Sequence, residues 1–283
     1  MTAITVLHPG AMGVSVAASF AIAGHDVRWV AQGRTRATAD RAAAAGLESV
    51  ATLVEGCEHA DLLVSVCPPA AAVDVARSVA ISGFSGTYLD ANAIGPGTAL
   101  EVASIVAASG ATALDGSIIG LPAHQRDTTR LYLSGSAATA LADDLNGGPL
   151  SVLAIDGKIG AASALKMAYA GWTKGSSALL LALFAFASEM GVDDVLLAEW
   201  GLSQPQLPDQ LEARAAGVGP KAWRFVAEME EIASSLRAAG ISGGFHDGAA
   251  ETYAALARFK DASPPPELAA VVEALRTGGA TSE

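Results

Sequence analysis

Two kinds of segment alternate through the first 157 residues, and this alternation limits the folds open to the chain. Short aliphatic and β-branched runs occupy residues 4–8, 27–31, 62–67, 87–90, 111–114, 131–134 and 152–155. Alanine-rich stretches with the period of a helix lie between several of them, as at residues 11–23, 70–80 and 98–108. Strand, helix and strand in this order build parallel sheets. We therefore expect an α/β domain with a doubly wound sheet.

The pattern changes after residue 157. Helical blocks without a strand run between them cover residues 161–190, 192–200, 208–216, 220–239, 248–259 and 266–276. Gly191 and Gly240 stand where helices would end. The sequence thus predicts two domains, an α/β domain at residues 1–157 and an all-α domain at residues 158–283.

Charge and composition exclude several classes of partner. Seventeen basic against 29 acidic residues give a net charge of −12, which repels nucleic acid and anionic membrane surfaces. The longest apolar run, residues 178–187, is about half the length of a membrane span, so we expect a buried core helix. With no visible signal peptide and only two cysteines, we expect a cytoplasmic protein. The five scattered histidines predict no metal site.

The stretch between the first strand and the first helix has the pattern of a dinucleotide-binding turn. In such turns the middle glycine lets the backbone approach a pyrophosphate, and the last lets the helix pack against the strand. Gly10 and Gly13 occupy those places, and His8 stands where the first glycine would be. The residues predicted to contact the cofactor here are His8, Pro9, Gly10, Ala11, Met12 and Gly13.

The end of the second strand indicates which dinucleotide. Sites selective for NAD carry an Asp or Glu there, but residues 31–38 contain no acid. Two guanidinium groups and two hydroxyls suit a 2′-phosphate instead. We therefore expect NADP, bound by Gly33, Arg34, Thr35 and Thr38. The alternative is a solvated polar turn with incidental arginines.

With these motifs, the chain resembles the superfamily of 6-phosphogluconate dehydrogenase and the 3-hydroxyacid dehydrogenases. The matching blocks, in family order, are residues 8–13, 66–69, 90–96, 115–120, 129–135 and 160–171. The resemblance is closest to an NADP-binding branch with its own C-terminal helical domain. It implies a Rossmann domain followed by an all-α domain, and a homodimer that pairs through the helical domains. Residues 179–184 are compatible with the centre of that interface or with the core of the domain.

The resemblance also places the superfamily's catalytic lysine at Lys166. A buried amine with a lowered pKa can take a hydroxyl proton as hydride leaves the substrate, and the ammonium can return it. Thr173 falls on the same helix face, with Tyr169 and Ala170 flanking it. Without the resemblance, the alternative interpretation is that Lys166 is a charged residue on the surface of a helix.

Two departures from the family pattern affect the substrate. Ala170 stands where relatives carry an asparagine, and Ile119 and Gly120 stand where relatives carry a Ser-Gly-Gly turn that binds a substrate carboxylate. We assign Ile119, Gly120, Ala170 and Thr173 to substrate binding and expect a less anionic or bulkier substrate, a ketone or an imine. Tyr169 is a second catalytic candidate, its alternative being a core tyrosine.

Asn92 aligns with the family's polar residue beside the nicotinamide, so we expect it to contact the nicotinamide ribose. Cys67 and Pro68 follow a strand end and are expected to shape the loop over the adenosine, with Cys67 in a structural role. Together these features predict an NADP-dependent dehydrogenase or reductase. The alternatives are an imine reductase on the same scaffold and a non-catalytic NADP(H)-binding protein.

Overall fold

The computed structural model describes residues 1–278, so residues 279–283 of the predicted helical domain lie outside the described residues. The chain forms two compact units, Met1–Met167 and Ala168–Glu283. The assignment of cofactor binding to residues 1–157 and of substrate binding and pairing to residues 158–283 stays a prediction.

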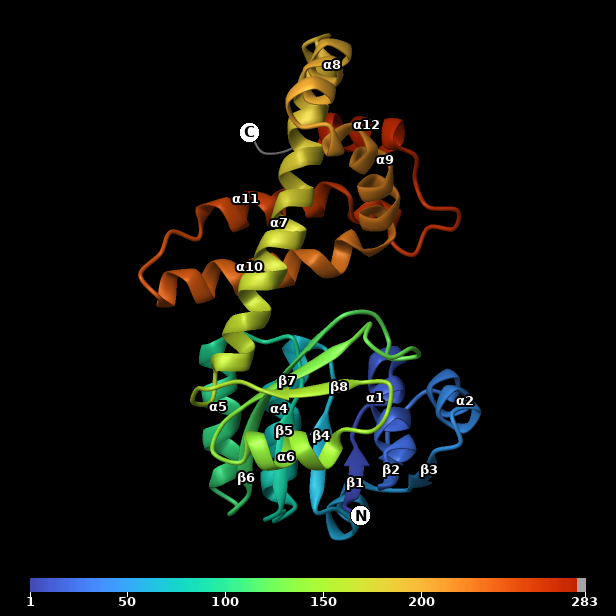
Figure 1. Ribbon diagram of the computed structural model, residues 1–283, viewed down its shortest axis with the longest axis vertical. Coiled ribbons are helices and arrows are strands. Elements are labelled where there is room, and N and C mark those ends of the chain that lie inside the picture. The colour runs from blue at the N-terminus through green and yellow to red at the C-terminus, as the bar shows by residue number, and fades with distance from the viewer. Residues whose placement is uncertain (279–283) are drawn as a thin grey trace. The chain divides into compact units, whose positions relative to one another are not determined.

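The first unit is built on one eight-stranded sheet (Figure 1), in the order β3-β2-β1-β4-β5-β6-β7-β8. The strands are β1 (Ala3–Val6), β2 (Asp26–Val30), β3 (Glu48–Val50), β4 (Leu62–Ser65), β5 (Thr87–Asp90), β6 (Thr112–Ile119), β7 (Arg130–Ser134) and β8 (Ser151–Ala154). The predicted runs all become strands; the three-residue β3 was missed because it is too short to show a period.

Neighbouring strands are parallel except for one pair. β7 runs antiparallel to β6, with Ser117 opposite Tyr132. The connection between β6 and β7 contains no helix, and a strand that returns without a crossover helix pairs antiparallel. The expected doubly wound sheet is confirmed, with this one reversal.

Helices cover both faces of the sheet. On one face, Phe20 of α1 (Ala11–Ile22) and Leu145 of α6 (Ala138–Leu145) share a buried cluster with Leu62 and Val64, and α2 (Arg36–Ala44) adds a residue to it. On the other, α4 (Ala72–Ile81) and α5 (Pro96–Ala107) pack over Leu63, beside α3 (Leu53–His59) and the short turn η1 (Pro69–Ala71). Successive residues of β4 thus serve opposite faces, which explains why the strand is apolar throughout.

The helix α7 (Ala161–Glu189) begins in the first unit and continues in the second. By length and composition it qualifies as a membrane-span candidate, but 56% of its most apolar window is buried inside the structure. Burial of that extent is typical of a core helix, as the short apolar run at residues 178–187 predicts.

The described part of the second unit, residues 168–278, contains helices joined by turns and no strand, so the expected all-α region is confirmed. After α7 come α8 (Asp193–Ser203), α9 (Gln206–Val218), η2 (Gly219–Lys221), α10 (Ala222–Ala238), α11 (Gly244–Ala255), η3 (Ala257–Phe259) and α12 (Leu268–Gly278). Tyr253 is fully buried and donates a hydrogen bond of 2.6 Å to the Lys174 carbonyl. A Cβ on Gly175 would lie 2.9 Å from the Phe245 ring, so a glycine there lets α11 approach α7.

Candidate functional site

The turn between β1 and α1 brings the helix very close to the strand. A Cβ on Gly13 would lie 2.1 Å from the carbonyl oxygen of His8, so a side chain at this position would overlap the backbone. Gly10 caps α1 with an extended backbone, and a Cβ there would have no atom within 4 Å. Gly13 therefore allows the close packing, and Gly10 leaves open space before the helix N-terminus, where Ala11 and Met12 begin α1.

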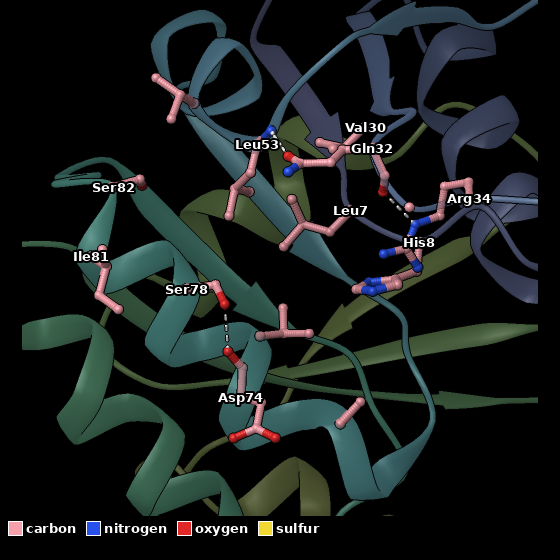
Figure 2. A pocket seen from close by; sticks show the side chains of 14 residues that line it. Leu7, His8, Val30, Gln32, Arg34, Leu53, Asp74, Ser78, Ile81 and Ser82 are labelled. Carbon is pink, nitrogen blue, oxygen red and sulfur yellow. Dashed lines mark hydrogen bonds between the residues drawn. The ribbon is translucent and has the colours of Figure 1, made fainter.

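A cavity of about 610 Å³ opens beside this turn (Figure 2). It lies at the carboxyl ends of β1 and β2, next to the point where the strand order reverses between β1 and β4. Open α/β sheets bind nucleotides at such points. The cavity is lined by Leu7, His8, Val30, Gln32, Gly33, Arg34, Leu53, Val54, Ala71, Asp74, Val75, Ser78, Ile81 and Ser82.

Hydrogen bonds hold the polar rim of the cavity in place. The Gln32 side-chain oxygen accepts from the backbone N–H of Leu53 at 3.0 Å, and Arg34 Nε donates to the Gln32 carbonyl at 3.1 Å. Gly33 supplies the turn between them with φ of +72°, a conformation that favours glycine. The rim is therefore a hydrogen-bonded turn that holds Arg34 beside the cavity.

His8 and Arg34 lie next to each other at one end of the cavity (Figure 2). Burial, and then the charge of Arg34, lower the pKa of His8 to about 4. The imidazole is therefore neutral at neutral pH, and its buried Nδ1 has no hydrogen-bond partner among the described residues. Arg34 thus supplies the positive charge at this end.

The start of α2 carries the remaining polar residues of the predicted phosphate site. The Thr35 hydroxyl caps the helix by accepting from the Thr38 N–H, and the two hydroxyls lie 3.1 Å apart. Arg36 is 94% exposed and pairs with Asp40. Arg41 was not predicted, yet it donates a hydrogen bond of 3.4 Å to the Pro9 carbonyl; it lies too far from the glycine turn in sequence for a local pattern to indicate this contact.

Cys67 and Asn92 belong to one buried network at the ends of β4 and β5. The Asn92 side-chain oxygen accepts from the Cys67 N–H at 2.6 Å, and its amide nitrogen donates to Ser65 and Asp90. Asn92 is 2% exposed, so these hydrogen bonds fix the loop that starts with Cys67 and Pro68. Burial raises the pKa of the Cys67 thiol to about 11, which leaves the thiol protonated and inert.

Lys166 lies in the first turns of α7. Side chains from β6 and β7 hold the N-terminus of this helix in place. The Asp115 carboxylate, 1% exposed, accepts from the N–H groups of Gly160 and Ser163 at 2.8 and 3.1 Å. The Ser134 hydroxyl donates to the same carboxylate and accepts from the Ala162 N–H. A carboxylate at a helix N-terminus satisfies N–H groups that lack intrahelical partners. This cap fixes where α7 leaves the sheet.

The Lys166 ammonium donates a hydrogen bond of 2.7 Å to the carbonyl oxygen of Ile118 in β6. The side chain is half-buried, and burial lowers its pKa from the usual lysine value. A lysine held in this way differs from an ordinary surface charge, because its neutral form is more accessible near physiological pH. The arrangement can therefore take up and release a proton.

The other predicted substrate residues lie on two elements. Ile119 is buried at the end of β6, and Gly120 follows it with φ of +133°. Tyr169 and Thr173 follow Lys166 along α7; Tyr169 is 49% exposed, and Ala170 is buried. Tyr169 is thus not the core residue that the alternative interpretation required.

The structure brings some predicted residues together and not others. His8, Gly33 and Arg34 line one cavity, while Cys67 and Asn92 are joined in a buried network at other strand ends. Gln32, Asp74 and Ser78 also line the cavity and were missed; Gln32 precedes the predicted residues directly, and the others lie on α4 without a sequence signal. Among residues 1–278, no three acidic, histidine or cysteine side chains are grouped to hold a metal ion.

Comparison with known proteins identifies similar sequences. Residues 187–256 match a family described as a domain of unknown function, DUF1932. The chain is 28% identical over 173 residues to an uncharacterized 28.5 kDa protein of the 7S RNA 5′ region of Methanothermus fervidus. This match covers 61% of the chain and 66% of the relative, just under two thirds of its length.

Similar solved structures cover nearly the whole chain. A conserved hypothetical protein from Sinorhizobium meliloti 1021 is 26% identical with a TM-score of 0.75, covering 98% of this chain and 97% of that one. The 3-hydroxyisobutyrate dehydrogenase of Mycobacterium tuberculosis, solved with L-serine, is 19% identical with a TM-score of 0.72, covering 98% and 99%. A reductive aminase from Aspergillus terreus, solved with NADPH4, cyclohexanone and allyl amine, is 20% identical with a TM-score of 0.56, covering 96% and 98%.

These likenesses agree with the motifs of the glycine turn and of the block around Lys166. The chain therefore shares the fold of the 3-hydroxyisobutyrate dehydrogenase, and part of its helical region matches DUF1932.

Proposed function

We propose that this protein is an NADP(H)-dependent oxidoreductase that transfers hydride between nicotinamide and the carbinol or carbonyl carbon of a small organic substrate. Its fold neighbours include a dehydrogenase and a reductive aminase, which supports an oxidoreductase. The observation that carries the choice of cofactor is Arg34, held by its hydrogen bond to Gln32 on the rim of the β1–β2 cavity.

The residues present fit an NADP molecule. The open space at Gly10 and the N–H groups at the start of α1 suit a pyrophosphate. Arg34, Thr35 and Thr38 suit the 2′-phosphate, and the apolar wall of the cavity suits an adenine ring. The one acid among the described lining residues, Asp74, is largely exposed and paired with Arg77 at 3.0 Å, so its charge is offset.

Bound nicotinamide supplies the acceptor or donor of hydride. In the oxidative direction the neutral Lys166 Nζ accepts the substrate hydroxyl proton as the C–H bond at the carbinol carbon breaks. In the reductive direction the Lys166 ammonium donates a proton to the new alkoxide oxygen. The Ile118 carbonyl holds Nζ in position, and the Asp115 cap holds the helix turn that carries it.

A second candidate function is the reduction of imines on the same scaffold. Buried Ala170 and Ile119 provide no polar side chain for a carboxylate, and Tyr169, three residues after Lys166 on α7, is 49% exposed. These features favour an uncharged substrate. A non-catalytic NADP(H)-binding protein is the remaining alternative, and NADPH-dependent turnover of a ketone or imine would exclude it.

The test begins with calorimetric titration of the protein with NADPH and NADH. We expect NADPH to bind at least about tenfold more tightly, because a 2′-phosphate forms charge-assisted hydrogen bonds with Arg34. Matched panels of ketones and cyclic imines then separate the two reactions. Absence of affinity for both coenzymes would overturn the proposal.

We also infer that the protein pairs as a homodimer, as the superfamily resemblance implies. Leu180, Leu181 and Phe184 are buried within the structure, so residues 179–184 serve partly as core of the helical unit. A molar mass in solution of twice the chain mass of 28.3 kDa, measured by light scattering, would support pairing. The mass of a monomer would contradict it.

A further inference from the structure

The helical unit contains a second cavity, unrelated to the glycine turn. It has a volume of about 560 Å³, within the range of about 300–1,000 Å³ of small-molecule pockets, and is lined by residues of α7, α8 and α9. Its apolar walls include Trp172, Leu179, Leu183 and Trp200, and its polar lining includes Gln210 and Arg214 of α9. Trp172 is 75% exposed, so the cavity has an aromatic side chain accessible from solvent.

Arg214 is the only charged residue among the described residues that line this cavity. Its Nη1 donates to the hydroxyls of Ser176 and Ser177 at 3.0 and 3.2 Å, and its Nη2 donates to the Gln210 side-chain oxygen at 2.6 Å. All of these partners are neutral, and no residue in the range 1–278 forms an ion pair with Arg214. A half-buried guanidinium without a counter-ion is unusual in a chain with a net charge of −12.

The hydrogen bonds of Arg214 do not use all five N–H groups of the guanidinium. Nε–H and the second Nη2–H donate to no residue in the described part of the chain. In a guanidinium, Nε–H lies side by side with one of the two N–H groups of Nη2, and this edge can bind a carboxylate through two parallel hydrogen bonds. The serine and glutamine partners meanwhile hold the guanidinium in a defined orientation.

We propose that this cavity binds a small carboxylate with an apolar body, its carboxylate on Arg214 and its hydrocarbon against Trp172, Leu179 and Leu183. The charge of Arg214 is complementary to the carboxylate, and the apolar walls supply the hydrophobic contribution. The site lies wholly on the helical unit and is separate from the cavity proposed for NADP.

Octanoate is the probe, with 1-octanol and octylamine as the neutral and cationic analogues of the same length. We expect calorimetry to show octanoate binding at least about tenfold more tightly than either analogue, the gain expected of hydrogen bonds between charged groups. Equal affinities for octanoate and octanol, or no octanoate binding, would overturn the proposal.

The decisive variant is Gln210→Glu, which keeps the shape of the side chain and gives Arg214 an internal carboxylate. It should weaken octanoate binding at least about tenfold and change octanol binding little, because the internal ion pair competes with the ligand. Arg214→Gln should have the same effect, whereas Arg224→Gln, which removes an exposed arginine paired with Asp261, should have none. Unchanged octanoate affinity in Gln210→Glu would overturn the proposal.

A second copy of the chain is the competing occupant. If Leu183→Glu converts a dimer into a monomer, and the wild-type dimer binds no octanoate, the cavity is an interface and the proposal is wrong. Circular dichroism confirms that each variant is folded before its binding is compared.

Discussion

The Nζ atom of Lys166 lies 2.7 Å from the carbonyl oxygen of Ile118, a residue 48 positions earlier in the chain. This hydrogen bond joins the start of α7 to the end of β6 and holds the amine in a half-buried position. The surroundings lower the pKa of Lys166 through burial. An amine that is both positioned and partly desolvated is suited to proton transfer, and the first two predictions follow from it.

Lys166→Met should lower kcat by about 10²–10⁴-fold, the usual contribution of a general acid or base. Binding of NADPH should stay within about twofold, because the side chain contacts β6 and not the β1–β2 cavity. Steady-state kinetics and calorimetry measure the two effects. Lys158→Met, an exposed lysine just before α7, is the matched control and should keep full activity. Wild-type turnover by Lys166→Met would remove Lys166 from the mechanism.

The pH dependence of the two reaction directions should be opposite. Oxidation requires neutral Lys166, so its kcat/KM should rise with pH; reduction requires the ammonium, so its kcat/KM should fall. Because burial lowers the pKa of Lys166, both inflections should lie below the usual lysine value of 10.5. Arginine does not titrate in this range, so Lys166→Arg should abolish the inflection in any residual activity. An inflection kept in that variant would identify another group.

Arg34→Gln should weaken NADPH binding by about tenfold or more and leave NADH binding within about twofold. The loss corresponds to charge-assisted hydrogen bonds with the 2′-phosphate, which NADH lacks. Arg36→Gln is the control, because Arg36 is exposed and paired with Asp40. Equal losses for NADPH and NADH would show that Arg34 does not select the cofactor.

Substitution of each glycine in the β1–α1 turn should distinguish an effect on the stability of the fold from an effect on NADPH binding. Gly13→Ala should reduce the free energy of unfolding by about 3 kcal/mol, because its Cβ would overlap the His8 carbonyl. Gly10→Ala should change it by less than about 1 kcal/mol, since its backbone suits alanine and its Cβ meets no atom. It should nevertheless weaken NADPH binding about tenfold by filling the space proposed for the pyrophosphate.

Thermal denaturation and calorimetric titration of both variants check this prediction. A Gly10→Ala variant that binds NADPH normally would place the pyrophosphate elsewhere.

The local sequence pattern was sufficient to predict the secondary-structure elements and their order along the chain. Apolar runs such as residues 62–67 and the glycine spacing at Gly10 and Gly13 identify strands, helices and the dinucleotide turn, because side-chain periodicity and backbone freedom are properties of neighbouring residues. The same information predicted the α/β unit followed by helices, and the motif blocks indicated the superfamily.

Contacts between residues that are far apart in the sequence could be identified only from the tertiary structure. Nothing near Asp115 in sequence indicates that it caps α7, or that Asp74 and Ser78 line the cavity beside His8. Nor does the sequence indicate that the Asn92 side-chain oxygen accepts a hydrogen bond from the Cys67 N–H; the contact of Asn92 with the nicotinamide ribose stays a prediction. Likewise, the sequence does not indicate that Arg214 of α9 donates to Ser176 and Ser177 of α7 and forms no ion pair within residues 1–278. Hydrogen bonding and burial depend on how elements pack together, and a one-dimensional pattern does not contain that packing.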